Sequence, residues 1–229
     1  EVAMAVAVND VINKVQETLQ DTAGIRWSVA DELIKWLNDA QNEIALLKPD
    51  ATSENTTVTL ATGTKQSIPS DGNRLLRVMR NMSAASGGNG GRAIRVVARD
   101  VLDTQTPTWH DPAVTGDAAH TNVVKNYIYD EQDPKNYYVF PGVSGNAYIE
   151  IVYSKNPATV AAGANLSVDD MYETAVMHYV LYMAYMKESE VSANAQRAAN
   201  HYRIFLSLLG AKDQRDSIDT PNVERTGVA

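Results

Sequence analysis

The sequence predicts an α+β fold, in which a bundle of about four helices carries an inserted antiparallel β region with two or more hairpins. Apolar residues recur at helical spacing in the first 50 residues and again after residue 166, and β-forming residues alternate with turn formers between them. Because both helical regions are amphipathic, we expect them to pack together as one domain with a β insertion. The expected segments are an N-terminal helix pair (1-55), the β insertion (56-160), a C-terminal helix pair (161-210) and a flexible polar tail (211-229).

The first segment is predicted to be an antiparallel helix pair. The first helix has Asn9 or Asp10 as a candidate N-cap, and its apolar stripe is Val8, Val11, Ile12, Val15 and Leu19. The second helix begins at an S-x-x-D capping box, Ser28 and Asp31, and ends at Lys48–Pro49, because proline disfavours helix in the residue before it.

The middle of the chain is predicted to form strands. Threonine-rich segments flank a turn at 61–64, and a second hairpin joins RLLRVMRNMS to RAIRVVAR through a glycine-rich SGGNGG tip. Arginines recur every third residue in the first arm, so a helix there remains an alternative. An irregular stretch follows (101–120). Three further strands are expected at 126–129, 136–140 and 147–154, separated by turn-forming DEQDP and PGVSGN.

The C-terminal helices should begin at a capping box formed by Ser167 and Asp170 and end at Gly210, a residue type common after a helix end. Their broad aromatic face indicates packing, including packing between subunits, by Tyr172, Tyr179, Tyr182, Met186, Tyr202 and Phe205. The remaining residues are polar and aperiodic and include Pro221, so we expect a tail there and no helix.

Composition limits the possible classes of protein. The chain has 229 residues, a formal net charge of -8 and no cysteine, which excludes disulfides and thiolate metal sites and fits a reducing cytoplasm. An acidic balance argues against a dedicated nucleic-acid binder. No apolar run approaches the ~20 residues that cross a bilayer, so we expect no membrane association.

Residues with catalytic potential do not form a recognisable motif. The four histidines are not in metal-ligand spacing, and the glycines of SGGNGG do not match a phosphate-binding loop. We therefore expect no catalytic residue, no metal and no cofactor. A hydrolytic enzyme built on TWHDP, with His110 beside Asp111, is the competing hypothesis, but it needs a nucleophile and an orienting group from elsewhere in the chain.

One segment concentrates positive charge without any acidic residue. It runs from 74 to 99 and contains Arg74, Arg77, Arg80, Arg92, Arg95 and Arg99. On a regular strand Arg77 would lie on the face opposite Arg74 and Arg80. The segment is either a solvated surface or a contact with phosphate or an acidic protein. Without aromatic residues for base stacking, sequence-specific nucleic-acid binding is not expected.

Short phrases along the chain resemble the head–tail adaptor (connector) proteins of bacteriophages. They are RWSVADELIKWLNDAQNEI and LLKPDA near the start, NYYVFPG and IEIVYSKNP in the strands, and VDDMYETAVMHYVLYMAY and AANHYRIFLSLLG near the end. The likeness extends from Val8 to Gly210 and is nearest to the tail tubular protein A group of short-tailed phages.

The resemblance implies a structural protein of the virion, made in the host bacterial cytoplasm and located at the head–tail junction. Such adaptors form a ring, usually of twelve subunits, between the portal protein and the tail nozzle or tail tube protein, and double-stranded DNA passes through the ring without specific binding. The helices would make the ring contacts. The C-terminal tail would dock on the portal through residues such as Lys212, Arg215, Ile218, Pro221 and Val223.

The resemblance also bears on the arginine segment. Because DNA must slide through such a channel, we expect the arginines to contact an acidic neighbouring protein, and we expect replacement of Arg77, Arg80, Arg92 and Arg95 by serine to weaken assembly. The alternative function is a cytoplasmic nucleic-acid or protein binding module that uses the Arg74–Arg99 hairpin. That alternative predicts salt-sensitive DNA binding by the monomer.

Overall fold

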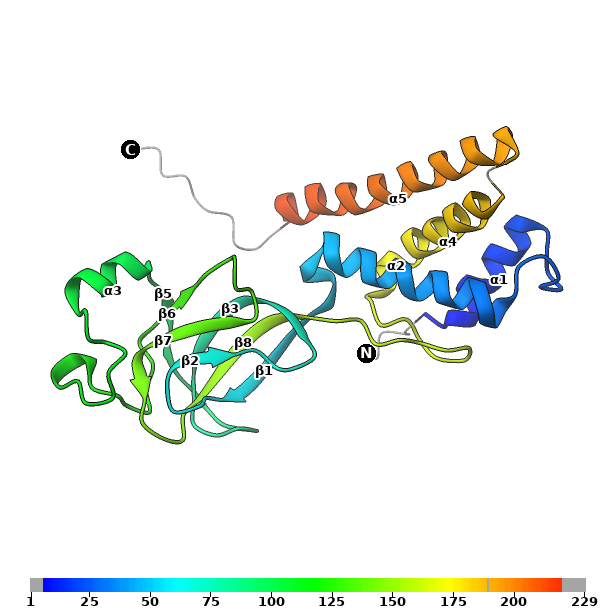
Figure 1. The fold of residues 1–229 in the computed structure, drawn as a ribbon. Coiled ribbons are helices and arrows are strands. Elements are labelled where there is room, and N and C mark those ends of the chain that lie inside the picture. Colours follow the sequence, from blue (N-terminus) through cyan, green and yellow to red (C-terminus); the bar gives the residue numbers. More distant parts are fainter. Residues whose placement is uncertain (1–5, 189, 220–229) are drawn as a thin grey trace. The chain divides into compact units, whose positions relative to one another are not determined.

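A computed structural model of the chain describes the backbone of residues 6–188 and 190–219, and side chains up to Gly210 within those ranges. The chain divides into two compact units, where we expected one domain (Figure 1). The helical unit contains the chain up to Lys48 and from Pro157 onward, and the strand unit is the continuous segment Pro49–Asn156. Helices and two four-stranded sheets confirm the α+β class.

The helical unit is organised around α4 (Glu173–Lys187), which contacts α1 (Val8–Leu19), α2 (Ile34–Leu47) and α5 (Ser192–Asp219) (Figure 1). Apolar side chains lie all around α4, and a helix of that kind is stable only when other elements cover it. Its fully or nearly fully buried residues are Ala175, Val176, Val180, Leu181 and Ala184. Burial of each valine or leucine among them contributes roughly 1.5–3 kcal/mol.

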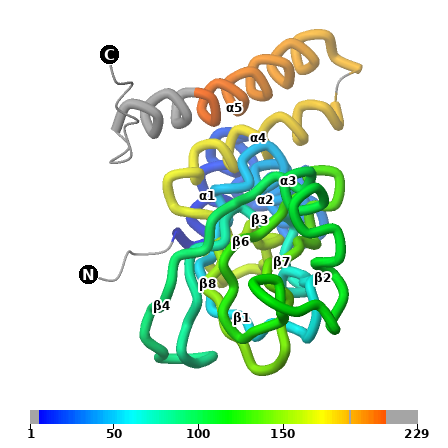
Figure 2. Tube along the Cα trace, turned by 90° about the vertical axis from the view of Figure 1, so that its left-hand side faces the viewer, coloured from blue at the N-terminus to red at the C-terminus, as the bar shows by residue number. Residues whose placement is uncertain are grey.

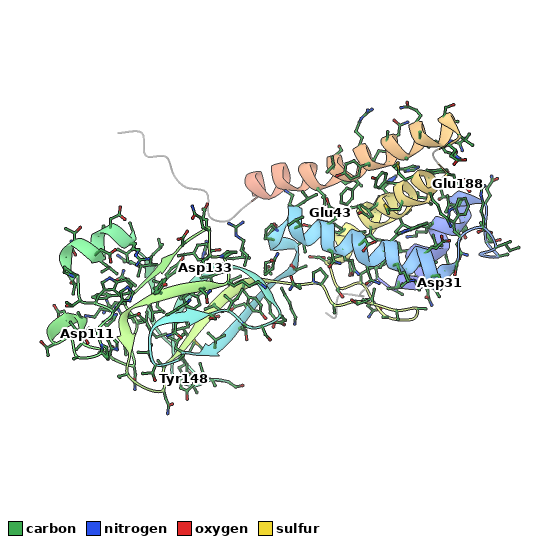
Figure 3. All side chains as sticks on the ribbon, in the orientation of Figure 1. Asp31, Glu43, Asp111, Asp133, Tyr148 and Glu188 are labelled. Carbon is green, nitrogen blue, oxygen red and sulfur yellow. The ribbon has the colours of Figure 1, made fainter. Side chains whose placement is uncertain are left out.

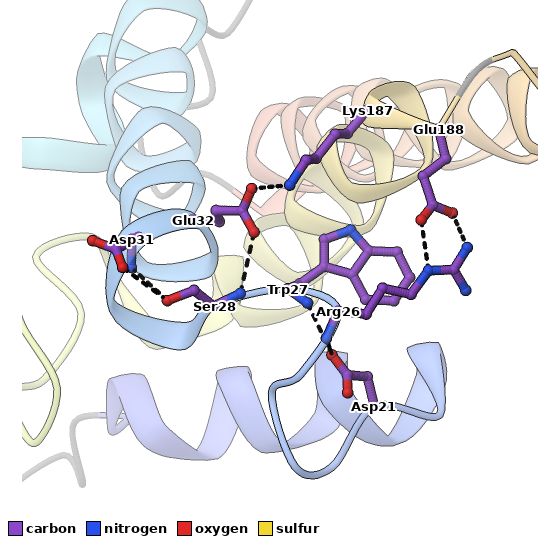
Figure 4. Close-up of polar contacts among 8 residues, drawn as sticks. All are labelled: Asp21, Arg26, Trp27, Ser28, Asp31, Glu32, Lys187 and Glu188. Atoms are coloured by element: carbon purple, nitrogen blue, oxygen red, sulfur yellow. Dashed lines mark hydrogen bonds and ion pairs between the residues drawn. The ribbon is translucent and has the colours of Figure 1, made fainter.

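Polar contacts fix the loop between α1 and α2 (Figure 4). The Asp21 carboxylate accepts hydrogen bonds from the backbone N–H groups of Ile25, Arg26 and Trp27. These bonds, the one from Trp27 above all, lower the pKa of Asp21. Arg26 then forms a two-pronged pair with Glu188 at the end of α4.

One predicted helix cap, at the start of α2, is confirmed, whereas three other predicted helix ends are wrong. Ser28 Oγ accepts the Asp31 N–H at 3.2 Å as predicted, and a short π-helical turn (Val29–Leu33) leads into α2. In contrast, α1 begins at Val8 without a side-chain cap, so the predicted cap at Asn9 or Asp10 is wrong. Asn9 Oδ1 instead accepts the Gly163 N–H at 3.1 Å.

The predicted capping box at Ser167 and Asp170 is also wrong. The Ser167 N–H donates to Gln41 Oε1 at 2.6 Å and its hydroxyl donates to the Ala158 carbonyl, so Ser167 joins α2 to the segment before α4. Asp169 caps the short 3-10 turn Asp170–Tyr172 instead. Finally, α5 continues through Gly210 to Asp219, so the expectation that the helix ends at Gly210 and a tail begins at residue 211 is wrong. A glycine can occupy a helix interior at a cost of about 1 kcal/mol, so its presence does not by itself end a helix.

The strand unit consists of two sheets that enclose a core. The first sheet has the order β1-β8-β3-β4, with β1 Ser53–Thr59, β8 Tyr148–Lys155, β3 Gly72–Met82 and β4 Gly90–Ala93. The second has the order β2-β7-β6-β5, with β2 Gly63–Ser67, β7 Asn136–Val143, β6 Asn126–Tyr129 and β5 Arg95–Val96. Buried residues of both sheets meet in one cluster, including Ile149 and Ile151 from β8 and Tyr137 and Val139 from β7.

The predicted hairpin at 61–64 is wrong, because its two arms join different sheets: β1 pairs with β8, and β2 pairs with β7. Gln66 stabilises the connection between them. Its amide donates to the Ala61 carbonyl at 2.7 Å and accepts the Ala61 N–H at 2.8 Å. The other predicted hairpin is confirmed only near its tip, where β3 and β4 pair antiparallel, and the loop that joins them stands apart from the other strands in Figure 2. The rest of its second arm leaves the hairpin, because β5 pairs with β6 in the second sheet and Arg99 begins a helix.

The second sheet is covered on its other face by a segment that we expected to be irregular. That segment contains a helix, α3 (Arg99–Gln105), from which Leu102 packs with Trp109 and Ile128. Along β7, Tyr137 and Val139 face the core between the sheets, whereas Tyr138 and Phe140 pack against this second cluster. This alternation is the period of two that a strand covered on both faces requires.

Candidate interaction surfaces

The arginines of β3 lie on one face of the first sheet, which corrects the expectation that Arg77 would lie opposite the other two. Register shifts occur at every third residue of β3, so that Arg74, Arg77 and Arg80 pair with Ser154, Val152 and Glu150 of β8. These partners are alternate residues of β8 and therefore share a face. The period of three thus results from β-bulges, and the alternative of a helix in this arm is excluded.

The buried face of β3 follows the same rule. Leu75, Val78 and Asn81 pair with Tyr153, Ile151 and Ile149, and all three are buried. Each bulge therefore adds one residue between a buried position and the next. As a result, the buried side chains stay on the core face of the sheet, and one arginine in each repeat lies on the opposite, solvent-facing side.

The six arginines are not equivalent, because some already have anionic partners within the chain. Arg80 Nε donates to Glu150 Oε2 at 2.6 Å, and Arg99 pairs with Asp103 at 3.3 Å. Among the described residues, Arg74, Arg77, Arg92 and Arg95 have no ion pair. Exposed surface pairs contribute at most about 1 kcal/mol, so leaving the other four arginines unpaired costs the fold little and keeps them available to a partner.

Two of the unpaired arginines line a cavity. It has a volume of about 390 Å³ and its lining residues are Arg92, Ala93, Arg95, Lys125 and Asn126. Sequence reasoning identified the two arginines but missed Lys125 and Asn126. Their position depends on the parallel pairing of β5 with β6, for which the sequence gives no local signal.

The predicted aromatic face has two kinds of residue. Tyr172 and Phe205 are buried within the helical unit, whereas Tyr179, Tyr182 and Tyr202 are half-buried and form a chain of ring contacts between α4 and α5. Burial and nearby negative charges raise the pKa of Tyr179 to about 12, which keeps its hydroxyl protonated. The remaining member, Met186, is 43% exposed and so is free to contact another molecule.

His178 and His201 face each other between α4 and α5, and their Nδ1 atoms lie 2.8 Å apart. Burial lowers the pKa of both, and for His201 the neighbouring His178 adds to the effect. Tyr185 stacks on the His201 ring, and Arg197 lies over Tyr185. This pair joins two helices, and no third metal ligand accompanies it among the described residues.

The side chains of the TWHDP motif make contacts that hold the fold together. His110 Nδ1 lies 2.7 Å from the hydroxyl of Thr64, which is 7% exposed, and the Asp111 carboxylate accepts the Ala113 N–H instead of contacting His110. Trp109 donates to Asp103 at 2.8 Å, and this bond lowers the pKa of Asp103. Because the Thr64 hydroxyl is buried, it does not offer an accessible nucleophile beside His110.

Acidic side chains are scattered over each unit, as the positions of Asp111 and Asp133 in the strand unit illustrate (Figure 3). Within residues 6–188 and 190–219, no three His, Asp or Glu side chains come together as metal ligands. Over the same residues, no helix has the length and apolar character of a bilayer-spanning segment.

The predicted docking residues of the tail fall at the edge of the described chain. Lys212, Arg215 and Ile218 belong to the backbone of α5, while Pro221 and Val223 lie outside the described residues.

Comparison with known proteins identifies the family. No curated protein matches the chain. The family model described as SU10 adaptor protein matches residues 7–225, which include nearly all of both units. This match agrees with the resemblance to phage adaptors and with a structural role in a virion. The chain belongs to the SU10 adaptor protein family of bacteriophages.

Proposed function

We propose that the protein is a head-to-tail adaptor, which forms a ring under the portal, joins the portal to the tail nozzle or tail tube, and continues the channel through which DNA passes. The observation that carries this proposal is the family match over residues 7–225. Twelve copies, docking of the C-terminal residues on the portal, and a nearer likeness to the tail tubular protein A group are finer parts of the same proposal.

The surfaces of the two units support a protein that works through contacts. The outer face of the first sheet presents Arg74, Arg77 and Arg80 in a row, and a second group of cations surrounds the cavity at Arg92 and Arg95. The net charge of -8 repels any polyanion at long range, so these cations suit a short-range contact with the carboxylates of a neighbouring protein better than a grip on an extended DNA backbone.

Assembly with the portal protein of the same phage tests the arginine contact. We expect Arg77→Ser, Arg92→Ser and Arg95→Ser together to weaken the complex, measured by sedimentation at moderate salt. Arg80 is retained because its loss would leave Glu150 without its ion-pair partner.

The matched control replaces three cations that have no ion pair among the described residues and lie outside the arginine segment, Lys35, Lys65 and Lys135. Equal assembly by the arginine variant, the control and the unmodified chain would show that the arginines are only a solvated face. Salt-sensitive DNA binding by the monomer, in the absence of portal binding, would instead favour the cytoplasmic binding module.

A further inference from the structure

We propose that the cavity between β4, β5 and the start of β6 binds a carboxylate-bearing segment of a partner protein. This proposal rests on the adaptor function above in one respect, namely that the partner is another protein of the virion. We call this cavity the cationic pocket. Its lining residues are Arg92, Ala93, Arg95, Lys125 and Asn126, and its volume is about 390 Å³.

The first argument is that the fold brings three cations from separate segments into one concave place. Arg92 comes from β4, Arg95 from β5 and Lys125 from the residue just before β6. The lining contains no acidic residue. Like charges that lie close together repel one another, even though solvent weakens the repulsion, so binding of an anion among them is favourable.

The second argument is that buried hydrogen bonds fix the backbone on both sides of the pocket. Asn81 is 6% exposed, and its amide nitrogen donates to the Arg92 carbonyl at 2.9 Å and to the Val124 carbonyl at 2.8 Å. Its amide oxygen accepts the Val124 N–H at 2.8 Å. One side chain therefore joins the residue that carries the first cation to the neighbour of Lys125.

The parallel pairing of β5 with β6 fixes the third cation. The Arg95 N–H donates to the Lys125 carbonyl at 3.3 Å, and Arg95 pairs in register with Asn126. The Lys125 N–H in turn donates to the Phe140 carbonyl of β7 at 2.8 Å. The backbone that carries the three cations is thus held by strand pairing before any ligand arrives, which lowers the entropic cost of binding.

The third argument is that these cations are left without partners where nearby ones are not. Arg80 and Arg99 have carboxylate partners, whereas Arg92, Arg95 and Lys125 have no ion pair among the described residues. Arginine forms short, two-pronged hydrogen bonds with carboxylates, and the lysine adds a third donor group. The side-chain amide nitrogen of Asn126 donates a weak hydrogen bond to the Arg95 carbonyl at 3.4 Å, and the side-chain oxygen of Asn126 remains an acceptor.

The chemistry of the lining favours a protein carboxylate over a nucleic acid. Apart from the cations, the lining residues are Ala93 and Asn126, so no aromatic ring is present on which a base could stack. Proteins usually bind the backbone of a DNA duplex through an extended row of cations, whereas the three cations of this pocket surround one cavity. The net charge of -8 also opposes long nucleic acids more than a short acidic peptide.

The direct test measures binding of a fluorescein-labelled peptide of ten glutamates to the full chain by fluorescence anisotropy. We expect saturable binding, and we expect the combined substitutions Arg92→Gln, Arg95→Gln and Lys125→Gln to weaken it at least ~10-fold, because each removes a charge-assisted hydrogen bond. Circular dichroism and urea unfolding verify that the variant keeps its fold.

A control with the same change in net charge separates the pocket from general electrostatics. It replaces Lys65, Lys135 and Arg203 by glutamine, three exposed cations without an ion pair among the described residues. We expect the control to change the peptide affinity less than ~2-fold at physiological salt, where separated surface charges are largely screened.

Three results would overturn the proposal. The first is an equal loss of peptide affinity in the pocket variant and in the control. The second is no binding of the peptide by the unmodified chain. The third is tighter binding of a labelled DNA duplex than of the peptide, lost in the pocket variant, which would assign the pocket to nucleic-acid phosphate. None of these results depends on ring formation or portal docking, so failure of the pocket and failure of the adaptor function are distinguishable.

Discussion

At the scale of single residues, Asn81 is the buried polar side chain on which most of the geometry of the cationic pocket depends. We predict that Asn81→Leu lowers the free energy of unfolding by about 3 kcal/mol, because it removes the partner of the buried N–H and carbonyl of Val124 and of the part-buried carbonyl of Arg92. Urea unfolding measures the change. Asn55→Leu is the control, since exposed Asn55 bonds only Glu150, and a similar cost for both variants would contradict the prediction.

Gly142 illustrates a second residue whose role depends on packing. A Cβ added there would overlap the imidazole of His120, whose Nε2 is buried. We predict that Gly142→Ala destabilises the protein by about 1–3 kcal/mol, the usual cost of overpacking, and lowers the melting temperature. For Gly145, the nearest atom to an added Cβ is Asn122 Oδ1 at 3.6 Å, so Gly145→Ala should have little effect. Equal melting temperatures of the two variants would show that His120 can move aside.

At the scale of elements, the contact between α4 and α5 should respond to pH. Because burial lowers the pKa of His178 and His201, the unfolded chain binds more protons than the folded one below about pH 6.5, and stability should fall as the pH drops through that value. Above it the stabilisation is complete. We predict that the free energy of unfolding in urea is lower at about pH 5.5 than at about pH 7.5.

The variant His178→Asn with His201→Asn isolates this effect, because an amide can replace the hydrogen bond without titrating in this range. We expect its stability to change less between the two pH values. Other titrating groups, such as His110 and Glu32, are common to both proteins and cancel. An unchanged pH dependence would refute the role of the pair.

Element prediction from the sequence succeeded where a local signal determined the structure. The period of apolar residues identified α1, α2 and α4, and Lys48–Pro49 marked the end of α2. It failed where tertiary contacts compete with a local signal. Ser167 contacts Gln41 and so does not act as a cap, and a glycine at 210 lies inside α5 because the helix continues.

The strands show the same limit. Arginines at every third residue of β3 are typical of a helix, and only the pairing with β8 through repeated bulges makes a strand of them. The arginines of the pocket were evident in the sequence, but Lys125 was not, since a parallel pair between β5 and β6 has no signature in spacing.

At the scale of the whole molecule, the two units differ in how the chain forms them. Pro49–Asn156 is continuous and has its own core, whereas the helical unit is assembled from both ends of the chain. We predict that residues 49–156 produced alone fold cooperatively, with a single unfolding transition and β-type circular dichroism. A fragment that shows no cooperative transition would contradict this independence.

The central claim, that the chain is a head-to-tail adaptor, is tested most directly by light scattering and negative-stain imaging of the purified protein mixed with the portal protein of the same phage. The account predicts rings of this chain seated on the portal, whether or not rings form without it. A protein that stays monomeric and binds neither the portal nor the tail proteins of that phage would contradict the claim.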